Sequence, residues 1–161
     1  MKSLNFLPIS IKVSFAFLLA FNLSSCDKCE DIDCFSPPEA FCFQLIDKET
    51  NQNLLQNGTY SFSDIQIKSI SEEKFHTLQI DSVEIEEQKQ VVLIDNEIGW
   101  ETENKDYILI LNDSLEFNFI YQTKKKSEDC CAFYETEEVS FSELKVEIPT
   151  PNNGFFYKLA L

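Results

Sequence analysis

Six cysteines carry most of the reactive chemistry in this sequence of 161 residues. They stand at Cys26, Cys29, Cys34, Cys42, Cys130 and Cys131. A thiol can accept an acyl group, form a disulfide or, once deprotonated, bind a metal ion. The surroundings of each cysteine along the chain decide between these uses. Cys26 differs from the others because it directly follows an apolar leader.

Residues 1–25 have the three parts of a secretory signal, which are a basic start, an apolar run and small residues before a cleavage point. Lys2 and Lys12 supply the positive charge, and residues 13–23 (VSFAFLLAFNL) form the apolar run. This run has 11 residues, whereas a helix that spans a bilayer needs about 20. We therefore expect the leader to be removed rather than to remain in a membrane.

The residues Leu23-Ser24-Ser25-Cys26 resemble the lipobox of bacterial lipoproteins. The resemblance implies that the Cys26 thiol takes a diacylglycerol and that Cys26 becomes the acylated first residue of the mature chain. Such an anchor should hold, because it carries at least two acyl chains, whereas one chain binds a membrane only reversibly. The alternative is an ordinary secretory signal with a cysteine nearby by chance.

Acidic residues follow closely, at Asp27, Glu30, Asp31 and Asp33. An acidic patch in this place resembles the surface-export signal of Bacteroidota lipoproteins, whereas Asp directly after the cysteine resembles an enterobacterial inner-membrane retention mark. The lack of arginine and the wealth of Lys, Asn, Ile and Phe favour the first. We expect an outer-membrane protein exposed at the cell surface. The periplasmic face is the alternative, and a solvated acidic linker is the plainer account of the patch.

The composition limits the partners of the chain. The formal net charge is −15, from 13 lysines and 28 acidic residues, and it becomes −17 once residues 1–25 leave with two of the lysines. Nucleic-acid binding depends on Lys and Arg that neutralise phosphates, so this charge excludes a nucleic-acid partner. The chain has only three glycines and no glycine-rich loop for phosphates or dinucleotides.

Five cysteines remain for the folded chain if Cys26 is lipidated. Disulfides persist in exported proteins, and we favour Cys29–Cys34, with Cys42 bonded to Cys130 or Cys131. The rival is a metal site on the first four cysteines, but their spacing matches no zinc pattern. We therefore expect no metal and no cofactor.

Residues 41–161 predict an all-β domain. Short runs rich in Phe, Ile, Val and Tyr alternate with turn-forming clusters, and no run keeps a helical period. The clearest runs are 41–47, 65–70, 91–94, 107–111, 115–123 and 155–161. Their number and spacing predict a single antiparallel β-sandwich, immunoglobulin-like in general shape, with a small β-barrel as the alternative.

The expected organisation has three parts. Residues 1–25 are a lipoprotein signal peptide, 26–40 an acidic tether that contains cysteines, and 41–161 the sandwich. Within the sandwich, the apolar residues of 77–86 (TLQIDSVEIE) change from even to odd positions. Because side chains alternate strictly along a strand, this change predicts a turn or bulge near Asp81-Ser82.

The chain has a single histidine, His76. A Ser–His–Asp hydrolase would have to use it, yet no G-x-S-x-G nucleophile motif occurs. Without arginine, the chain also lacks a bidentate clamp for phosphate or carboxylate substrates. We expect His76 to face solvent in a loop or at a strand edge, and the protein not to be an enzyme. A hydrolase would require a cleft around His76 or two facing carboxylates.

The single tryptophan, Trp100, follows Gly99 among polar residues. An exposed Trp100 would be a candidate ligand contact, which offers a stacking surface to a sugar ring or a protein. A buried Trp100 would fill the core, and burial is our prediction. Clustered carboxylates suit calcium, but no D-x-[DN]-x-[DN]-G loop is present. A glycan- or calcium-binding module would predict an exposed Trp100 or a compact carboxylate cluster.

Further features extend over nearly the whole mature chain. They are the lipobox, the Cys29/Cys34 pair, Pro37-Pro38, FCFQLIDKETNQNLLQNGTY, YILIL and Cys130-Cys131. Together they resemble a type of small lipoprotein found in Bacteroidota, and this resemblance implies no catalytic residues. We expect a lipid-anchored envelope or cell-surface protein with a non-catalytic binding or structural role. Its expected partners are the membrane, through the anchor, and an envelope protein or a glycan.

Overall fold

The computed structural model describes residues 34–85, 87–102, 105–128, 131–150 and 155–161. Contacts divide the chain into two units, Met1–Asp33 and Cys34–Leu161. The predicted leader, Cys26 and Cys29 lie outside the described residues, as does Cys130. Within the described residues, no helix has the length and apolar character needed to cross a membrane.

The described part consists of strands and two short 3-10 helices, η1 and η2. In chain order the elements are β1 (Cys34–Ser36), β2 (Phe41–Ile46), η1 (Phe62–Asp64), β3 (Ile65–Ser69), β4 (Leu78–Ile85), β5 (Gln88–Asp95), η2 (Ile98–Trp100), β6 (Asp106–Leu111), β7 (Leu115–Glu128), β8 (Cys131–Phe141), β9 (Lys145–Glu147) and β10 (Tyr157–Ala160). The first strand, β1, lies in the segment predicted as a tether.

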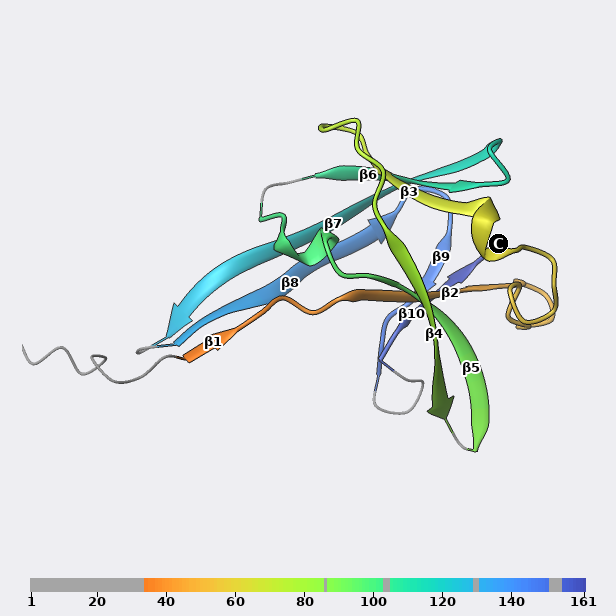
Figure 1. Cartoon of the computed structure of the whole chain (residues 1–161), viewed down its shortest axis with the longest axis horizontal. Coiled ribbons are helices and arrows are strands. Elements are labelled where there is room, and N and C mark those ends of the chain that lie inside the picture. The colour runs from red at the N-terminus through yellow and green to blue at the C-terminus, as the bar shows by residue number, and fades with distance from the viewer. Residues whose placement is uncertain (1–33, 86, 103–104, 129–130, 151–154) are drawn as a thin grey trace, which may run out of the picture. The chain divides into compact units, whose positions relative to one another are not determined.

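The strands form two five-stranded sheets. Sheet A has the order β1-β8-β7-β6-β3, and sheet B has the order β4-β5-β2-β10-β9. Figure 1 shows β7 and β8 as a long paired ribbon, with β1 running beside one end of β8. Side chains from both sheets pack into one core. These observations confirm the predicted all-β sandwich.

Two strand pairings are parallel, which the sequence pattern did not indicate. β1 runs parallel to β8, and the last strand, β10, runs parallel to β2. The remaining pairings between named strands are antiparallel. Parallel neighbours need a long connection between them, so both pairings join segments that are far apart in the chain.

The core follows the alternation read from the sequence. Phe41 and Phe43 of β2 are fully buried, and Phe119 and Tyr121 of β7 face them. The ring of Phe41 lies 5.7 Å from that of Phe119 and 5.1 Å from that of Tyr121, centroid to centroid. Burial of each large apolar side chain stabilises the fold by about 1.5–3 kcal/mol. These rings therefore hold the two sheets together.

The predicted break near Asp81-Ser82 is wrong. β4 pairs with β5 without a register shift from Leu78 to Ile85. The apolar residues change parity because the two ends of this edge strand bury opposite faces. At one end Leu78 packs against the core, whereas at the other end Val83 and Ile85 line a cavity on the outer face of sheet B.

The disulfide pairing also differs from the prediction. Cys34 bonds to Cys131, with the two Cα atoms 4.6 Å apart, and the bond ties β1 to the start of β8. Cys42 is a free, half-buried thiol. The predicted Cys29–Cys34 bond and the predicted bond of Cys42 to Cys130 or Cys131 are therefore wrong. The actual pair is set by the parallel register of β1 on β8, which places Cys34 directly opposite Cys131.

We expect the double substitution of Cys34→Ala and Cys131→Ala to lower the free energy of unfolding by about 4–5 kcal/mol. The bond closes a loop with a sequence separation of 97. In the chain-entropy model, a crosslink over a loop of this size lowers the conformational entropy of the unfolded chain and so stabilises the fold by that amount. Denaturant unfolding measures the loss. Cys42→Ala is the matched control, with a loss of about 1 kcal/mol. Equal losses in the two variants would contradict the prediction.

Candidate functional site

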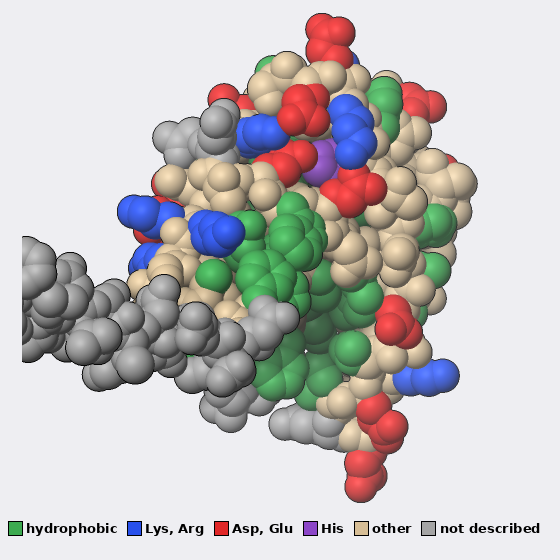
Figure 2. Space-filling view, turned by 60° about the vertical axis from the view of Figure 1, so that its left-hand side comes forward, with side chains coloured by type: hydrophobic (Ala, Val, Ile, Leu, Met, Phe, Trp, Pro, Cys, Tyr) green, Lys and Arg blue, Asp and Glu red, His purple; other side chains and the backbone are tan. Residues whose placement is uncertain are grey.

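Three aromatic side chains, Phe35, Trp100 and Tyr134, lie together at the surface, and we call them the aromatic surface. Phe35 stacks on Trp100 with ring centroids 6.0 Å apart. Tyr134 meets both rings edge-on, at 6.1 Å from Phe35 and 5.5 Å from Trp100. Phe35 is 48% exposed and Trp100 is 49% exposed. Figure 2 shows one face of the molecule on which hydrophobic side chains gather, with charged side chains around them.

The prediction that Trp100 fills the core is wrong. Ile98, at the other end of η2, takes the core position and has no exposed area. In a 3-10 helix only residues three apart share a direction, so residues 98 and 100 point to different sides. Trp100 therefore turns outward, and its indole ring is available to a ligand.

The disulfide places Phe35. Cys34 is bonded to Cys131, and the parallel register sets Phe35 opposite Ala132. Ala132 and Tyr134 share a face of β8, because side chains alternate along a strand. The Phe35 ring consequently lies over the same face as Tyr134, which explains their edge-on contact.

Gly99 and Thr123 place Trp100. A side chain at Gly99 would put its Cβ 2.6 Å from the carbonyl oxygen of Glu39 and 3.0 Å from Cβ of Pro38. Only glycine permits this approach of η2 to the chain that follows β1. On the other side, the buried Thr123 hydroxyl lies 2.9 Å from the Gly99 carbonyl oxygen and 3.1 Å from that of Glu101, and donates to them.

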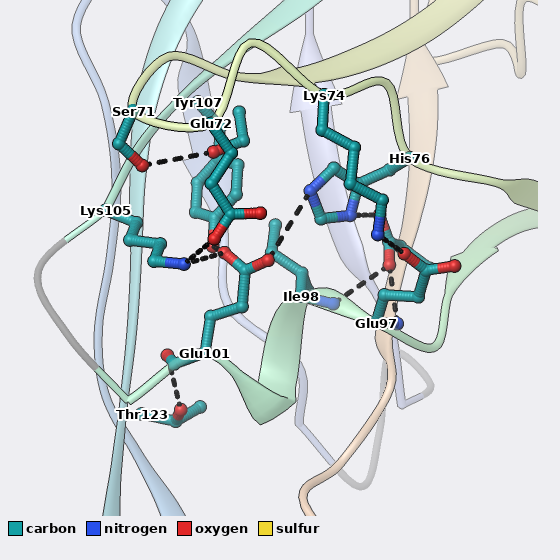
Figure 3. Close-up of polar contacts among 12 residues, drawn as sticks. Ser71, Glu72, Lys74, His76, Glu97, Ile98, Glu101, Lys105, Tyr107 and Thr123 are labelled. Atoms are coloured by element: carbon teal, nitrogen blue, oxygen red, sulfur yellow. Dashed lines mark hydrogen bonds and ion pairs between the residues drawn. The ribbon is translucent and has the colours of Figure 1, made fainter.

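Asp95 holds the start of this segment. It follows Leu93 on the core face of β5 and is fully buried. Its Oδ1 accepts hydrogen bonds from the backbone N–H of Glu97 at 2.8 Å and of Ile98 at 3.0 Å. An Asp that satisfies the N–H groups two and three residues on is a common turn device. Figure 3 draws these contacts at the base of η2.

The other oxygen of Asp95 faces His76. Nδ1 of His76 lies 2.9 Å from Oδ2 of Asp95, and neither side chain has exposed area. The contact lacks the in-line geometry of a hydrogen bond, and it is an ion pair when the imidazole is protonated. The prediction that His76 faces solvent is therefore wrong. The backbone N–H of His76 donates to the carbonyl oxygen of Ile67, and this bond brings the segment before β4 against the core.

Glu101 completes the network from the far end of η2. Its Oε1 lies 4.0 Å from Nε2 of His76, and its Oε2 accepts a hydrogen bond from the Tyr107 hydroxyl. Lys105 Nζ lies 3.3 Å from the same Oε2 and also pairs with Glu72. Figure 3 shows these side chains converging from the segment around Glu72, from η2 and from β6. Residues 95–101 are thus fixed at both ends.

Burial and charge act against each other on His76. Burial is the largest influence and lowers the pKa, but the contact with Asp95 and the negative charges of Asp95, Glu101 and Glu97 outweigh it. The pKa of His76 is therefore raised above its ordinary value. Burial, followed by the hydrogen bond and charge of Glu101, raises the pKa of Tyr107, so its hydroxyl remains a donor.

The His76 imidazole is enclosed in the network and is poorly placed to exchange protons with a substrate. The His76 side chain has no exposed area, and both of its nitrogens face carboxylates. A cavity of about 450 Å³ lies beside it, lined also by Phe62 and Phe75, but His76 can border this cavity only through its backbone. A substrate in that cavity does not reach the imidazole. This geometry gives no support to a hydrolase centred on His76.

Cys42 lies in an apolar cavity of about 280 Å³ on the outer face of sheet B, together with Val92, Ile94 and Phe156. Burial, followed by the charges of nearby acidic residues, raises the pKa of the Cys42 thiol. The thiolate is the nucleophilic form, so these surroundings keep Cys42 unreactive. Its position is that of a packing residue.

Among the described residues, no group of three or more His, Cys, Asp and Glu side chains could hold a metal ion. The carboxylates near His76 are engaged with cations. Glu72 pairs with Lys105, and Glu97 pairs with Lys74.

Of the residues singled out in the sequence, the structure brings Trp100 close to the Cys34–Cys131 bond through Phe35 and Tyr134. Phe35 and Tyr134 were not predicted as partners of Trp100. The position of Phe35 directly after a cysteine was the available signal. Comparisons with protein-family models, with curated proteins and with solved structures find no match to this chain.

We expect Gly99→Ala to destabilise the fold by about 1–3 kcal/mol and to shift the emission of Trp100, since the new methyl group collides with backbone. Trp100 is the only tryptophan, so intrinsic fluorescence reports it alone. Gly58→Ala is the control. Its φ of +78° is strained for alanine, but no atom lies within 4 Å of the added Cβ. The control should lose about 1–2 kcal/mol of unfolding free energy without a change in Trp100 emission. The same change of emission in both variants would contradict the prediction.

We also expect the single imidazole to titrate above its ordinary pKa of about 6.5. A raised folded pKa means that His76 stabilises the fold fully below about pH 6.5 and loses this contribution as the pH rises through the raised value. NMR titration of the one histidine gives the pKa directly. Asp95→Asn keeps an oxygen for the η2 N–H groups but removes the charge, so the His76 pKa should fall. A wild-type pKa at or below about 6.5 would refute the charge balance described above.

Proposed function

We propose that this protein is a lipid-anchored protein of the bacterial envelope with a non-catalytic binding role, and that the aromatic surface is its binding surface. The observation that carries the proposal is the outward position of Trp100, stacked on Phe35 directly after the disulfide-bonded Cys34. Large aromatic side chains that remain about half exposed are typical of interaction sites.

The anchor rests on the sequence around Cys26, which lies outside the described residues. A lipobox cysteine after a leader too short to span a bilayer supports acylation. The acidic residues that follow support the outer membrane as the location, with exposure at the cell surface. The periplasmic face remains the alternative.

The chemistry of the described side chains supports binding rather than catalysis. His76 is enclosed between Asp95 and Glu101, and the raised pKa of Cys42 keeps its thiol protonated. By contrast, Trp100 and Phe35 present apolar area to the outside.

A glycan-binding module is the second candidate. The exposure of Trp100 favours it, since sugar rings stack on indole and phenyl faces. An exposed Trp100 is the feature that such a module predicts from the sequence.

We expect metabolic labelling with an alkyne analogue of palmitate to mark the wild-type chain, and Cys26→Ala to abolish the label. Mass spectrometry should find Cys26 as the acylated first residue. Cys42→Ala is the matched control and should keep the label, because Cys42 is a half-buried residue of the folded sheet. An unlabelled wild-type chain, or a mature terminus at another residue, would refute the anchor.

A further inference from the structure

We infer that the partner of the aromatic surface is the lipid bilayer itself, with Trp100, Phe35 and Tyr134 lying in the headgroup region of the membrane that holds the anchor. This inference rests on the proposed anchoring at Cys26. It adds which surface of the domain faces the lipid and which side chains make the contact.

The chain between Cys26 and Cys34 is short. Cys26 and Cys34 are eight residues apart, so the chain between them spans about 29 Å at most. Phe35 is the next residue, and the bond of Cys34 to Cys131 prevents β1 from separating from β8. A lipid group on Cys26 therefore keeps the aromatic surface within one short tether length of the bilayer.

The side chains of the aromatic surface have the chemistry of a membrane interface. Trp and Tyr are enriched at membrane–water interfaces because each has an apolar ring and a polar group. Trp100 and Phe35 expose about half of their area, and Tyr134 contacts both rings. The register also sets Lys125 of β7 opposite Tyr134, and Lys125 is exposed. A lysine beside an apolar patch can extend its ammonium group to phosphate oxygens while its stem stays near the rings.

The proposed anchor gives the aromatic surface a high local concentration near the bilayer. A short linker between an anchor and a binding site gives the site a local concentration in the millimolar range. At such a local concentration, the aromatic surface needs only a weak intrinsic affinity for lipid to remain bound. The net charge of −17 for the mature chain opposes a strongly anionic bilayer, so contact through apolar rings fits better than contact through charge.

The test uses the lipidated full-length protein, reconstituted in phosphatidylcholine vesicles whose acyl chains carry bromine close to the headgroup. Bromine quenches tryptophan only at short range, and Trp100 is the sole tryptophan. We expect the brominated vesicles to quench most of the Trp100 emission. Vesicles brominated near the chain ends should quench it less, because the rings lie at headgroup depth.

Substitutions separate the aromatic surface from general proximity. Phe35→Ser and Tyr134→Ser remove neighbours of Trp100, and each should reduce the quenching. Phe62→Ser is the matched control, because Phe62 is also an exposed phenylalanine but precedes β3, at the opposite edge of sheet A from β1. It should leave the quenching unchanged. Circular dichroism confirms the fold of each variant, and the wild-type depth comparison does not depend on them.

Three outcomes would overturn the inference. Vesicle-bound protein whose Trp100 escapes bromine and stays open to aqueous acrylamide would show that the surface faces away from lipid, with the anchor intact. A saturable change of Trp100 emission with soluble oligosaccharides, without lipid quenching, would assign the surface to glycans. Protein that fails to remain with vesicles and carries no acyl group would refute the proposed anchoring, and the inference with it.

Discussion

The covalent bond between Cys34 and Cys131 is the constraint on which the arrangement of the surface depends. β1 has only three residues, and a strand of that length on a sheet edge has few hydrogen bonds to hold it. The disulfide supplies the missing stability from a loop with a separation of 97 residues. This bond positions Phe35, whose ring then contacts both Trp100 and Tyr134. The bond also fixes Cys34, the first described residue, at this edge of sheet A.

Residues 95–101 join a buried charge to an exposed ring. Asp95 binds the η2 backbone with one oxygen and faces His76 with the other, while Glu101 faces the same imidazole from the opposite end. Trp100 lies between these two residues in the chain. The Thr123 hydroxyl binds the backbone carbonyl oxygens of Gly99 and Glu101 on either side of it. The protonation state of His76 therefore bears on the segment that presents Trp100. A single histidine and a single tryptophan are parts of one structural unit.

Core residues that follow from the alternation of side chains along one strand could be predicted from the sequence. Contacts that depend on which strands pair could not. Phe41, Phe43 and the inward residues of β7 were evident from a period of two, and they form the core. The pairing of Cys34 with Cys131 was not evident, because it follows from a parallel register between segments far apart in the chain. The burial of His76 was not evident either, since it depends on the contact with Asp95 at the end of β5, which no local alternation indicates. Trp100 was misplaced because Ile98, two residues earlier, occupies the core position that we assigned to it.

Within the described part of the chain, β4 pairs only with β5 and forms an edge of sheet B, so the backbone groups of alternate residues of this eight-residue strand point away from the sheet. Such an edge is a template on which a neighbouring copy can add its own strand. Asp81 and Glu84 are exposed on β4, so two such edges that approach one another bring carboxylates together. If the proposed anchor confines many copies to a plane, they meet often, and electrostatic repulsion along this edge keeps the sheets of adjacent molecules from fusing into fibres.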